Sequence, residues 1–322
     1  TNYVTAGQKN LGYVRVTMEL MIKDEKFLPL VEHHEPMILN AIVSVFGKEQ
    51  EDAIKSLTGR EEIRLKILNQ LNELMKKETG AAVVGVTALG AYSWDWGSSK
   101  KFKMNSEGWF GDNTGSGGAD KLGHAFSSYA LNNVLTDRLV RKGRPVERAA
   151  LSAALTTQAI MFYVEVFDGF SNDHGFARED VAMNLLGSGL SYVRAVNPKV
   201  RDLVDFRLEY QSSGYKGFRP LSDYAGQKYV VALKLSGVDA LRQTPLRYLE
   251  LQTGYYARGF SKAERDAGID QSRHHFVGVG INLGELLFGQ RSERETELRN
   301  AGRVFFEHIQ VPSTAARSDR VL

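Results

Sequence analysis

The stretch GADKLGHAFSSYALNNVLTDRLV, residues 118–140, decides how the larger part of this chain folds. Its pattern predicts a helix from about Asp120 to Val140, and two more helices are expected over 145–167 and 178–196. The second opens on a proline, which suits the first helical position, and an Asn-Pro pair stops the third. The sequence therefore predicts a bundle of about three helices.

Polar side chains punctuate each of these helices beside otherwise apolar sequence. Each helix carries two of them three or four positions apart, a spacing that places both on one helix face. Burying a carboxylate is costly unless it is paired, protonated or bound to a cation. We therefore expect the three pairs to meet at one buried point. The pairs are Asp120 with His124, Glu165 with Asp168, and Asp180 with Asn184.

Two explanations of such a meeting point stay open. In the first, the carboxylates and the imidazole hold a divalent metal ion whose bound water would allow hydrolysis, with Asn184 orienting a ligand. In the second, Lys121, His124 and Arg178 neutralise the carboxylates in a hydrogen-bonded network that sets the helix register. The sequence indicates no catalytic residue and favours a protein that is not an enzyme. The only cofactor that it suggests is this metal ion.

The residues before the bundle have their own pattern. Alternating apolar residues over 13–22 predict a half-buried strand, and helices are expected over 36–46 and 59–77. Residues 1–80 are therefore expected to form a small α+β domain.

The remaining segments complete an α+β fold class. Residues 81–118 are expected to form an apolar stretch and a loop rich in Gly and Trp, before a three-helix domain over 119–197. A period of two over 198–311 predicts an antiparallel β-rich segment of about five strands. The polar residues 312–322 are expected to be a disordered tail. The prediction is a small N-terminal α+β domain, a helical bundle and an antiparallel β segment.

Two features suggest a membrane surface as a partner. The segment from Ala149 to Phe167 is long enough to span a bilayer, but polar residues interrupt it, so we expect a buried or membrane-facing helix. Four basic residues gather where the first helix ends, and they complement its dipole in a solvated turn or touch anionic headgroups. These residues are Arg138, Arg141, Lys142 and Arg144.

Bulk composition excludes several classes of protein. The chain has 322 residues and a formal net charge of only +3, which argues against a nucleic-acid partner. It has no cysteine, which excludes disulfides and thiolate metal sites. The first residue is Thr1, so the earlier removal of a leader is an expectation.

Residues 1–80 resemble the FliL family of flagellar basal-body-associated proteins. The resemblance rests on a strand over 13–21, a Pro-led helix starting at Pro36, and a Leu-Thr turn at Leu57-Thr58 that opens a longer helix. It implies a periplasmic protein–protein scaffold of ring-forming type that surrounds the flagellar stator.

Residues 90–197 resemble a YfiM-like family of periplasmic lipoproteins whose function is unknown, and they faintly resemble VanZ-like membrane proteins. Several separate blocks occur in the family's order. They are Ser93–Gly97, Glu107–Phe110, Gly118–His124, Glu165–Ser171 and Asp180–Gly187.

Together these patterns favour a scaffold of the bacterial cell envelope, periplasmic and membrane-associated. Flagellar stator proteins, a membrane surface and further copies of the chain are the expected partners. Two other interpretations stay open: a metal-assisted hydrolase acting on an envelope substrate, and a composite chain whose two modules have unrelated functions.

Overall fold

The computed structural model describes the chain almost completely from residue 96 onward and the residues before it in fragments. The described residues are 39, 42–45, 56, 58–59, 61–67, 69–70, 96, 98–106, 108–172, 174–214, 220, 222–290 and 296–322. The chain divides into two compact units, Thr1–Tyr92 and Ser93–Leu322. The fold class is α+β, with a helical segment followed by an antiparallel sheet, as the sequence predicts.

Helical turns are the described part of the first unit. They cover 42–45 and 61–67, and Ser56 accepts a hydrogen bond from the Gly59 backbone at 2.9 Å, which satisfies one amide of the opening turn. Ile63 and Ile67 are both 2% exposed and form the buried side of this helix. The strand expected over 13–22 and the apolar stretch over 81–92 lie outside the described residues.

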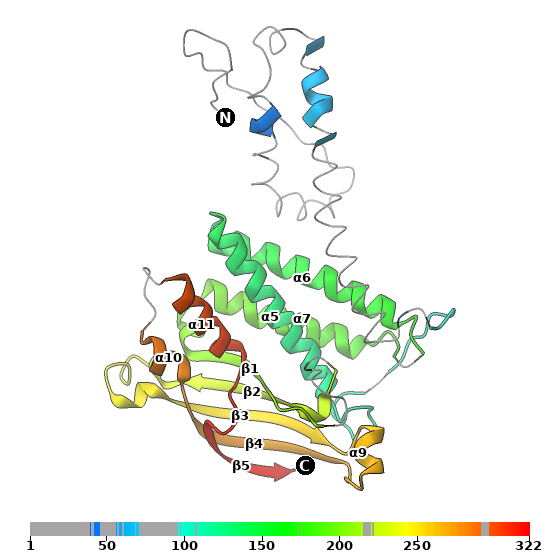
Figure 1. Cartoon of the computed structure of the whole chain (residues 1–322), viewed down its shortest axis with the longest axis vertical. Coiled ribbons are helices and arrows are strands. Elements are labelled where there is room, and N and C mark those ends of the chain that lie inside the picture. Colours follow the sequence, from blue (N-terminus) through cyan, green and yellow to red (C-terminus); the bar gives the residue numbers. More distant parts are fainter. Residues whose placement is uncertain are drawn as a thin grey trace. The chain divides into compact units, whose positions relative to one another are not determined.

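Three long helices open the second unit (Figure 1). They are α5 (Ala119–Arg141), α6 (Val146–Asp168) and α7 (Arg178–Val196), and they pack on one another as a single layer. A short helix, α8 (Pro198–Leu203), follows α7. The side chain of Asn197 caps α8 by accepting from the backbone of Lys199 and Val200.

A five-stranded antiparallel sheet follows, with neighbouring strands in chain order. Its strands are β1 (Val204–Tyr210), β2 (Gln227–Lys234), β3 (Leu249–Arg258), β4 (Ser272–Ile281) and β5 (Ala315–Val321). Three helices and three 3₁₀ turns interrupt the strands. These are α9 (Lys262–Asp266), α10 (Leu283–Phe288), α11 (Glu297–His308), and the turns at Tyr224–Gly226, Leu235–Gly237 and Pro245–Tyr248.

The chain end corrects one expectation. Residues 312–322 are not a disordered tail, because β5 pairs with β4 from Ala315 to Val321. Polar composition misled the sequence prediction, since an edge strand exposes most of its side chains while its backbone still satisfies the neighbouring strand. Of the five strands, four lie among the described residues of 198–311 and the fifth lies in this last segment.

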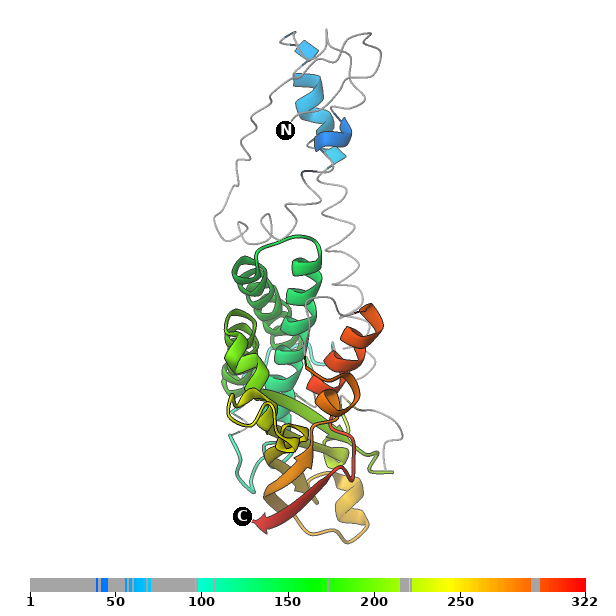
Figure 2. The ribbon, with the colours of Figure 1, turned by 90° about the vertical axis from the view of Figure 1, so that its left-hand side faces the viewer.

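One hydrophobic core joins the helical layer to the sheet. Tyr129 of α5 is fully buried, and its ring and that of Phe126 both lie 5.7 Å from the ring of Phe206 in β1. Tyr229 of β2 belongs to the same core. The bundle and the β-rich segment, which the sequence analysis treats as separate domains, therefore pack as one unit from Ser93 onward. Figure 2 shows the helical layer lying to one side of the sheet.

The contacts between helices are made by small and polar residues. Gly187 of α7 lies so close to α5 that an added Cβ would be 1.9 Å from the Ala125 carbonyl oxygen. Asn132 donates to the Ser188 carbonyl oxygen at 2.9 Å across the same contact. The other buried small or polar residues of the layer are Ser128, Thr136, Ala149, Ala150, Ser152, Ala153, Thr157, Asn184 and Ser191.

A buried charge network ties α7 and α11 to the sheet. Asp205 of β1 is fully buried and accepts from Arg194 of α7 at 2.8 Å, from Arg207 at 2.6 Å and from Lys234 at 2.7 Å. Glu307 of α11 lies 3.4 Å from the same Arg194. Burial alone would raise the pKa of Asp205, but Lys234, Arg207 and Arg194 hold it well below its usual range.

Gly187→Ala should lower the free energy of unfolding by at least about 2 kcal/mol, because its Cβ would push against backbone rather than a movable side chain. Gly189→Ala is the matched control on the same helix, since its Cβ meets nothing within 4 Å. That control should be neutral or stabilise by up to about 1 kcal/mol. Urea unfolding of the two variants measures both effects, and equal values would contradict close packing of α5 and α7.

Asp205→Asn should destabilise the chain by about 3–5 kcal/mol at neutral pH, since three buried cations lose their common partner. A depressed folded pKa stabilises above the unfolded value of about 3.9, and this stability is lost as pH falls toward the folded value. The gap in stability between wild type and variant should therefore begin to narrow below about pH 4 and continue to narrow as pH falls further. Denaturant unfolding across the acid range would measure this, and a constant gap would contradict it.

Candidate functional site

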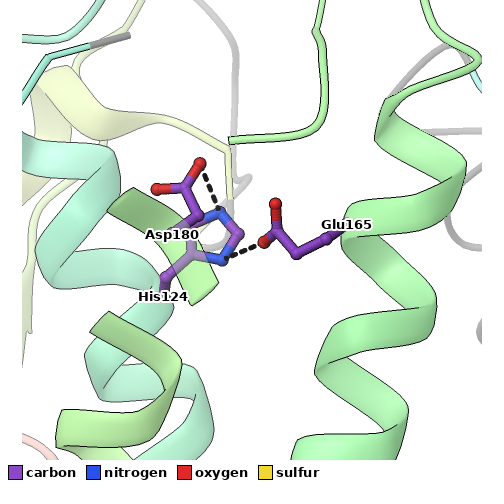
Figure 3. Close-up of side chains that lie close together, drawn as sticks. All are labelled: His124, Glu165 and Asp180. Atoms are coloured by element: carbon purple, nitrogen blue, oxygen red, sulfur yellow. Dashed lines mark ion pairs between the residues drawn. The ribbon is translucent and has the colours of Figure 1, made fainter. Parts of the chain in front are cut away.

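The ends of the three long helices meet at a cluster of ionisable side chains. His124 comes from the start of α5, Glu165 from the end of α6 and Asp180 from the start of α7. The His124 ring lies between the two carboxylates (Figure 3), with Nδ1 3.1 Å from Glu165 Oε1 and Nε2 3.8 Å from Asp180 Oδ2. Glu165 is fully buried and Asp180 is 5% exposed. Three helices are therefore joined through one imidazole.

Lys121 supplies a second cation to the same cluster. Its side chain is fully buried, and Nζ lies 2.8 Å from Asp120 Oδ2 and 2.9 Å from Asp180 Oδ1. Because a buried ammonium without partners would be prohibitively costly, these two carboxylates account for its position. The pair also fixes the first turn of α5 against the first turn of α7.

The loop before α5 is shaped to deliver these residues. Gly118 caps the helix at φ 84°, where a Cβ would be 2.6 Å from the Trp109 carbonyl oxygen, so only glycine fits. The Ser116 hydroxyl donates to Asp120, and the Asp120 amide donates back to that hydroxyl at 3.2 Å. The Gly-rich loop thus caps α5 and orients its first carboxylate.

A row of amides and hydroxyls supports Glu165 from inside the layer. Asn184 donates to Glu165 Oε1 at 3.4 Å, and Ser128 donates to Asn184 Oδ1 at 2.9 Å. Gln158 donates to the Asn184 carbonyl oxygen at 2.9 Å and also to Ser188. Asn184 is 1% exposed, so its side-chain orientation is set by these contacts.

Trp96 closes one side of the cluster. Its indole N–H donates to Asp168, and its ring lies 5.2 Å from that of Phe167 and 6.1 Å from that of Tyr163. At 9% exposure it packs as a lid over the end of α6. Trp109, by contrast, is 49% exposed.

Burial and mutual charge shift the protonation of the cluster. Burial would lower the pKa of His124, but the hydrogen bond with Glu165 and the charges of Asp180, Glu165 and Asp120 raise it to about 10. Burial raises the pKa of Asp168 to about 7 against the hydrogen bond from Trp96. Burial also raises the pKa of Asp180 despite His124 and Lys121. These neighbouring charges favour the protonated form of the His124 ring.

The structure brings together most of the residues that the sequence analysis singles out. Direct contacts link Asp120, Lys121, His124, Glu165, Asp180 and Asn184, and Asp168 joins the rim through Trp96. Arg178 is exposed and stands outside the cluster. Ser116, Ser128 and Gln158 belong to its hydrogen-bond network and are absent from the sequence prediction. Ser128 follows His124 by one helical turn, which is the signal that could have revealed it.

The basic residues at the α5–α6 turn have different partners. Arg141 pairs with Asp137, and Arg144 donates to Ser152 at 3.1 Å. Arg138 and Lys142 are exposed at the surface. The turn therefore keeps part of its positive charge available to a partner.

The cluster can do one of two things chemically. As an imidazolium, His124 neutralises two carboxylates and locks three helix ends together. As a neutral ligand, it would join Glu165 and Asp180, and ligand atoms of these three residues all lie within 4.8 Å of one another. A pocket of about 520 Å³ lined by Ser116, Tyr224 and Phe260 lies on the Asp120 side.

Comparison with known proteins gives two partial matches. Residues 1–88 match the family model of the flagellar basal body-associated protein FliL, and residues 106–196 match that of predicted periplasmic lipoproteins, DUF2279. Neither match supports the VanZ-like pattern. The flagellar protein FliL of Aquifex aeolicus (strain VF5) is 26% identical over 65 residues, which are 20% of this chain and 40% of that protein. No solved structure matches.

The two matched segments follow one another along the chain. The first is described as flagellar and the second as a periplasmic lipoprotein. Both descriptions belong to the cell envelope. The chain thus joins a FliL-like segment to a segment of predicted periplasmic lipoprotein type, and it is a periplasmic, envelope-associated protein.

Proposed function

We propose that this chain is an accessory scaffold of the cell envelope, whose N-terminal unit associates with the flagellar stator and whose second unit docks on a membrane surface. The FliL match supports the first contact. The polarity of the helical layer supports the docking on a membrane, because small and polar residues fill its interior while apolar side chains cover its outer side.

The outer faces of α6 and α7 expose large apolar side chains. On α6 they are Leu151, Leu155 and Phe162, which are 52%, 44% and 53% exposed. On α7 they are Leu185, Leu186 and Val193, which are 57%, 63% and 44% exposed. A helix that faces water normally has the opposite arrangement, with apolar residues inside and polar residues outside. Packing through small residues and interhelical amides is typical of helices next to lipid.

A lipid surface is the occupant that fits this side of the layer. Among the described residues, α6 is the one helix long and apolar enough to cross a membrane, and 39% of its apolar window is buried. Exposed Arg138, Lys142 and Arg148 lie where α5 ends and α6 begins. Basic residues there would contact anionic headgroups while the apolar side chains reach the acyl boundary.

Docking on a membrane surface fits the helical layer better than spanning the membrane does. The side of α5 that bears Phe126 and Tyr129 packs on the sheet, so the helical layer has one open side. A helical layer that the sheet covers on one side presents its other side to a bilayer without crossing it. The apolar face of α6 and α7 therefore acts as an interfacial surface.

Binding to vesicles of phosphatidylethanolamine and phosphatidylglycerol tests the docking face. Leu155→Asp combined with Phe162→Asp should weaken binding at least about tenfold, because each buried side chain contributes about 1.5–3 kcal/mol. The control is Leu251→Asp combined with Val279→Asp, a pair of exposed apolar residues facing each other on β3 and β4. Flotation that fails for the sheet pair and persists for the helix pair would contradict the proposal.

Copurification with detergent-solubilised stator proteins tests the first unit. Leu65 is 48% exposed on the helical stretch that buries Ile63 and Ile67, so Leu65→Asp should reduce recovery of the stator proteins. Leu298→Asp, 83% exposed on α11 of the second unit, should leave recovery unchanged. Recovery of stator proteins no greater than on bare resin would refute the stator contact. It would not affect membrane docking, which the vesicle experiment tests.

A further inference from the structure

We propose that His124, Glu165 and Asp180 bind a divalent transition-metal ion at the junction of α5, α6 and α7. This inference goes beyond the scaffold function, which needs no ion. It rests on the geometry of the three side chains, on a buried oxygen of Glu165 without a hydrogen bond, and on the charges around them.

The first argument is the arrangement of ligand atoms. One imidazole nitrogen and two carboxylate oxygens, each from a different helix, lie within 4.8 Å of one another. The 3.1 Å between His124 Nδ1 and Glu165 Oε1 suits two ligands of one ion, since each would sit about 2.0–2.2 Å from it. Figure 3 shows both carboxylates turned toward the ring of His124.

The second argument is an oxygen without a hydrogen bond. Glu165 is fully buried; Asn184 holds its Oε1, but its Oε2 has no hydrogen-bond partner. A buried carboxylate oxygen left unsatisfied is costly, and native structures rarely keep one without a reason. A cation held by both carboxylate oxygens of Glu165 beside His124 would satisfy this Oε2.

The third argument is the local charge. Among the described residues, the cluster holds four carboxyl groups, those of Asp120, Glu165, Asp168 and Asp180, and Lys121 pairs with only two of them, Asp120 and Asp180. Lys121 lies against Asp180 Oδ1, which leaves Oδ2 directed to the imidazole side. A divalent cation at this point would neutralise the two carboxylates that face the imidazole.

The ligand types indicate the class of ion. One nitrogen with carboxylate oxygens suits Zn²⁺, Mn²⁺ or Fe²⁺, whereas Ca²⁺ and Mg²⁺ prefer oxygen ligands alone. The Ser128–Asn184 pair behind Glu165 is the kind of outer support that fixes a metal ligand in place. Three protein ligands leave a further position for water, as open zinc sites do.

Calorimetric titration of the full-length, EDTA-treated chain with ZnCl₂ tests the site. We expect one equivalent to bind, and Glu165→Gln and His124→Gln each to weaken binding at least about tenfold. Asp137→Asn is the matched control, because Asp137 is a carboxylate of α5 whose side chain is 38% exposed. It should bind Zn²⁺ like the wild type. Absence of stoichiometric binding, or unchanged binding by Glu165→Gln, would overturn the proposal.

A second measurement decides the matter where a cluster variant fails to fold. Zn²⁺ added to the wild type should shift the Trp96 indole N–H resonance, because Trp96 donates to Asp168 beside the site, and should leave that of exposed Trp109 in place. Equal shifts of the two indole resonances, or none, would show that the ion does not bind at the helix junction. Neither measurement depends on vesicles or stator proteins, so the scaffold proposal stands or falls separately.

Discussion

The burial of Lys121 is the constraint on which the second unit depends. An ammonium with no exposed surface must have anionic partners, and Asp120 and Asp180 provide them from the starts of two different helices. To reach this buried ammonium, Asp120 and Asp180 must bring the starts of α5 and α7 into the interior as well. The start of α5 also needs Gly118, because a side chain at this position would collide with the Phe110 ring and the Trp109 carbonyl oxygen. The position of these carboxylates and the shape of the loop before α5 both follow from the buried charge of Lys121.

Spacing within each helix was readable from the sequence, while contacts between helices were only partly so. Asp120 and His124 are one turn apart, and so are Asp180 and Asn184, and those spacings place each pair on one face in the structure. Arg178 has the right charge, but it lies on an exposed face of α7 and does not join the cluster. Its proximity in sequence to Asp180 could not reveal the direction of its side chain.

The sheet shows a different limit of sequence reasoning. Alternation revealed the strands themselves, but not that Phe206 would share a core with α5, because a half-buried strand has the same pattern whichever layer covers it. The last strand escaped notice because Arg317, Asp319 and Arg320 resemble a solvated tail. Arg317 in fact lies over the Phe276 ring at 4.5 Å, so its charge coexists with an apolar contact.

Both ends of α7 are held by buried charges in separate networks, and this bears on how its outer face can act. Asp180 near the start contacts Lys121, and Arg194 near the end contacts Asp205 of the sheet. A shift of α7 by one turn would break both networks together, and Gly187 at its middle leaves no room for rotation against α5. Leu185 and Leu186 are therefore presented in a fixed register, which spares a docking partner the entropy cost of ordering them. The buried polar contacts inside the helical layer thus hold the exposed apolar side chains of its outer face in fixed positions.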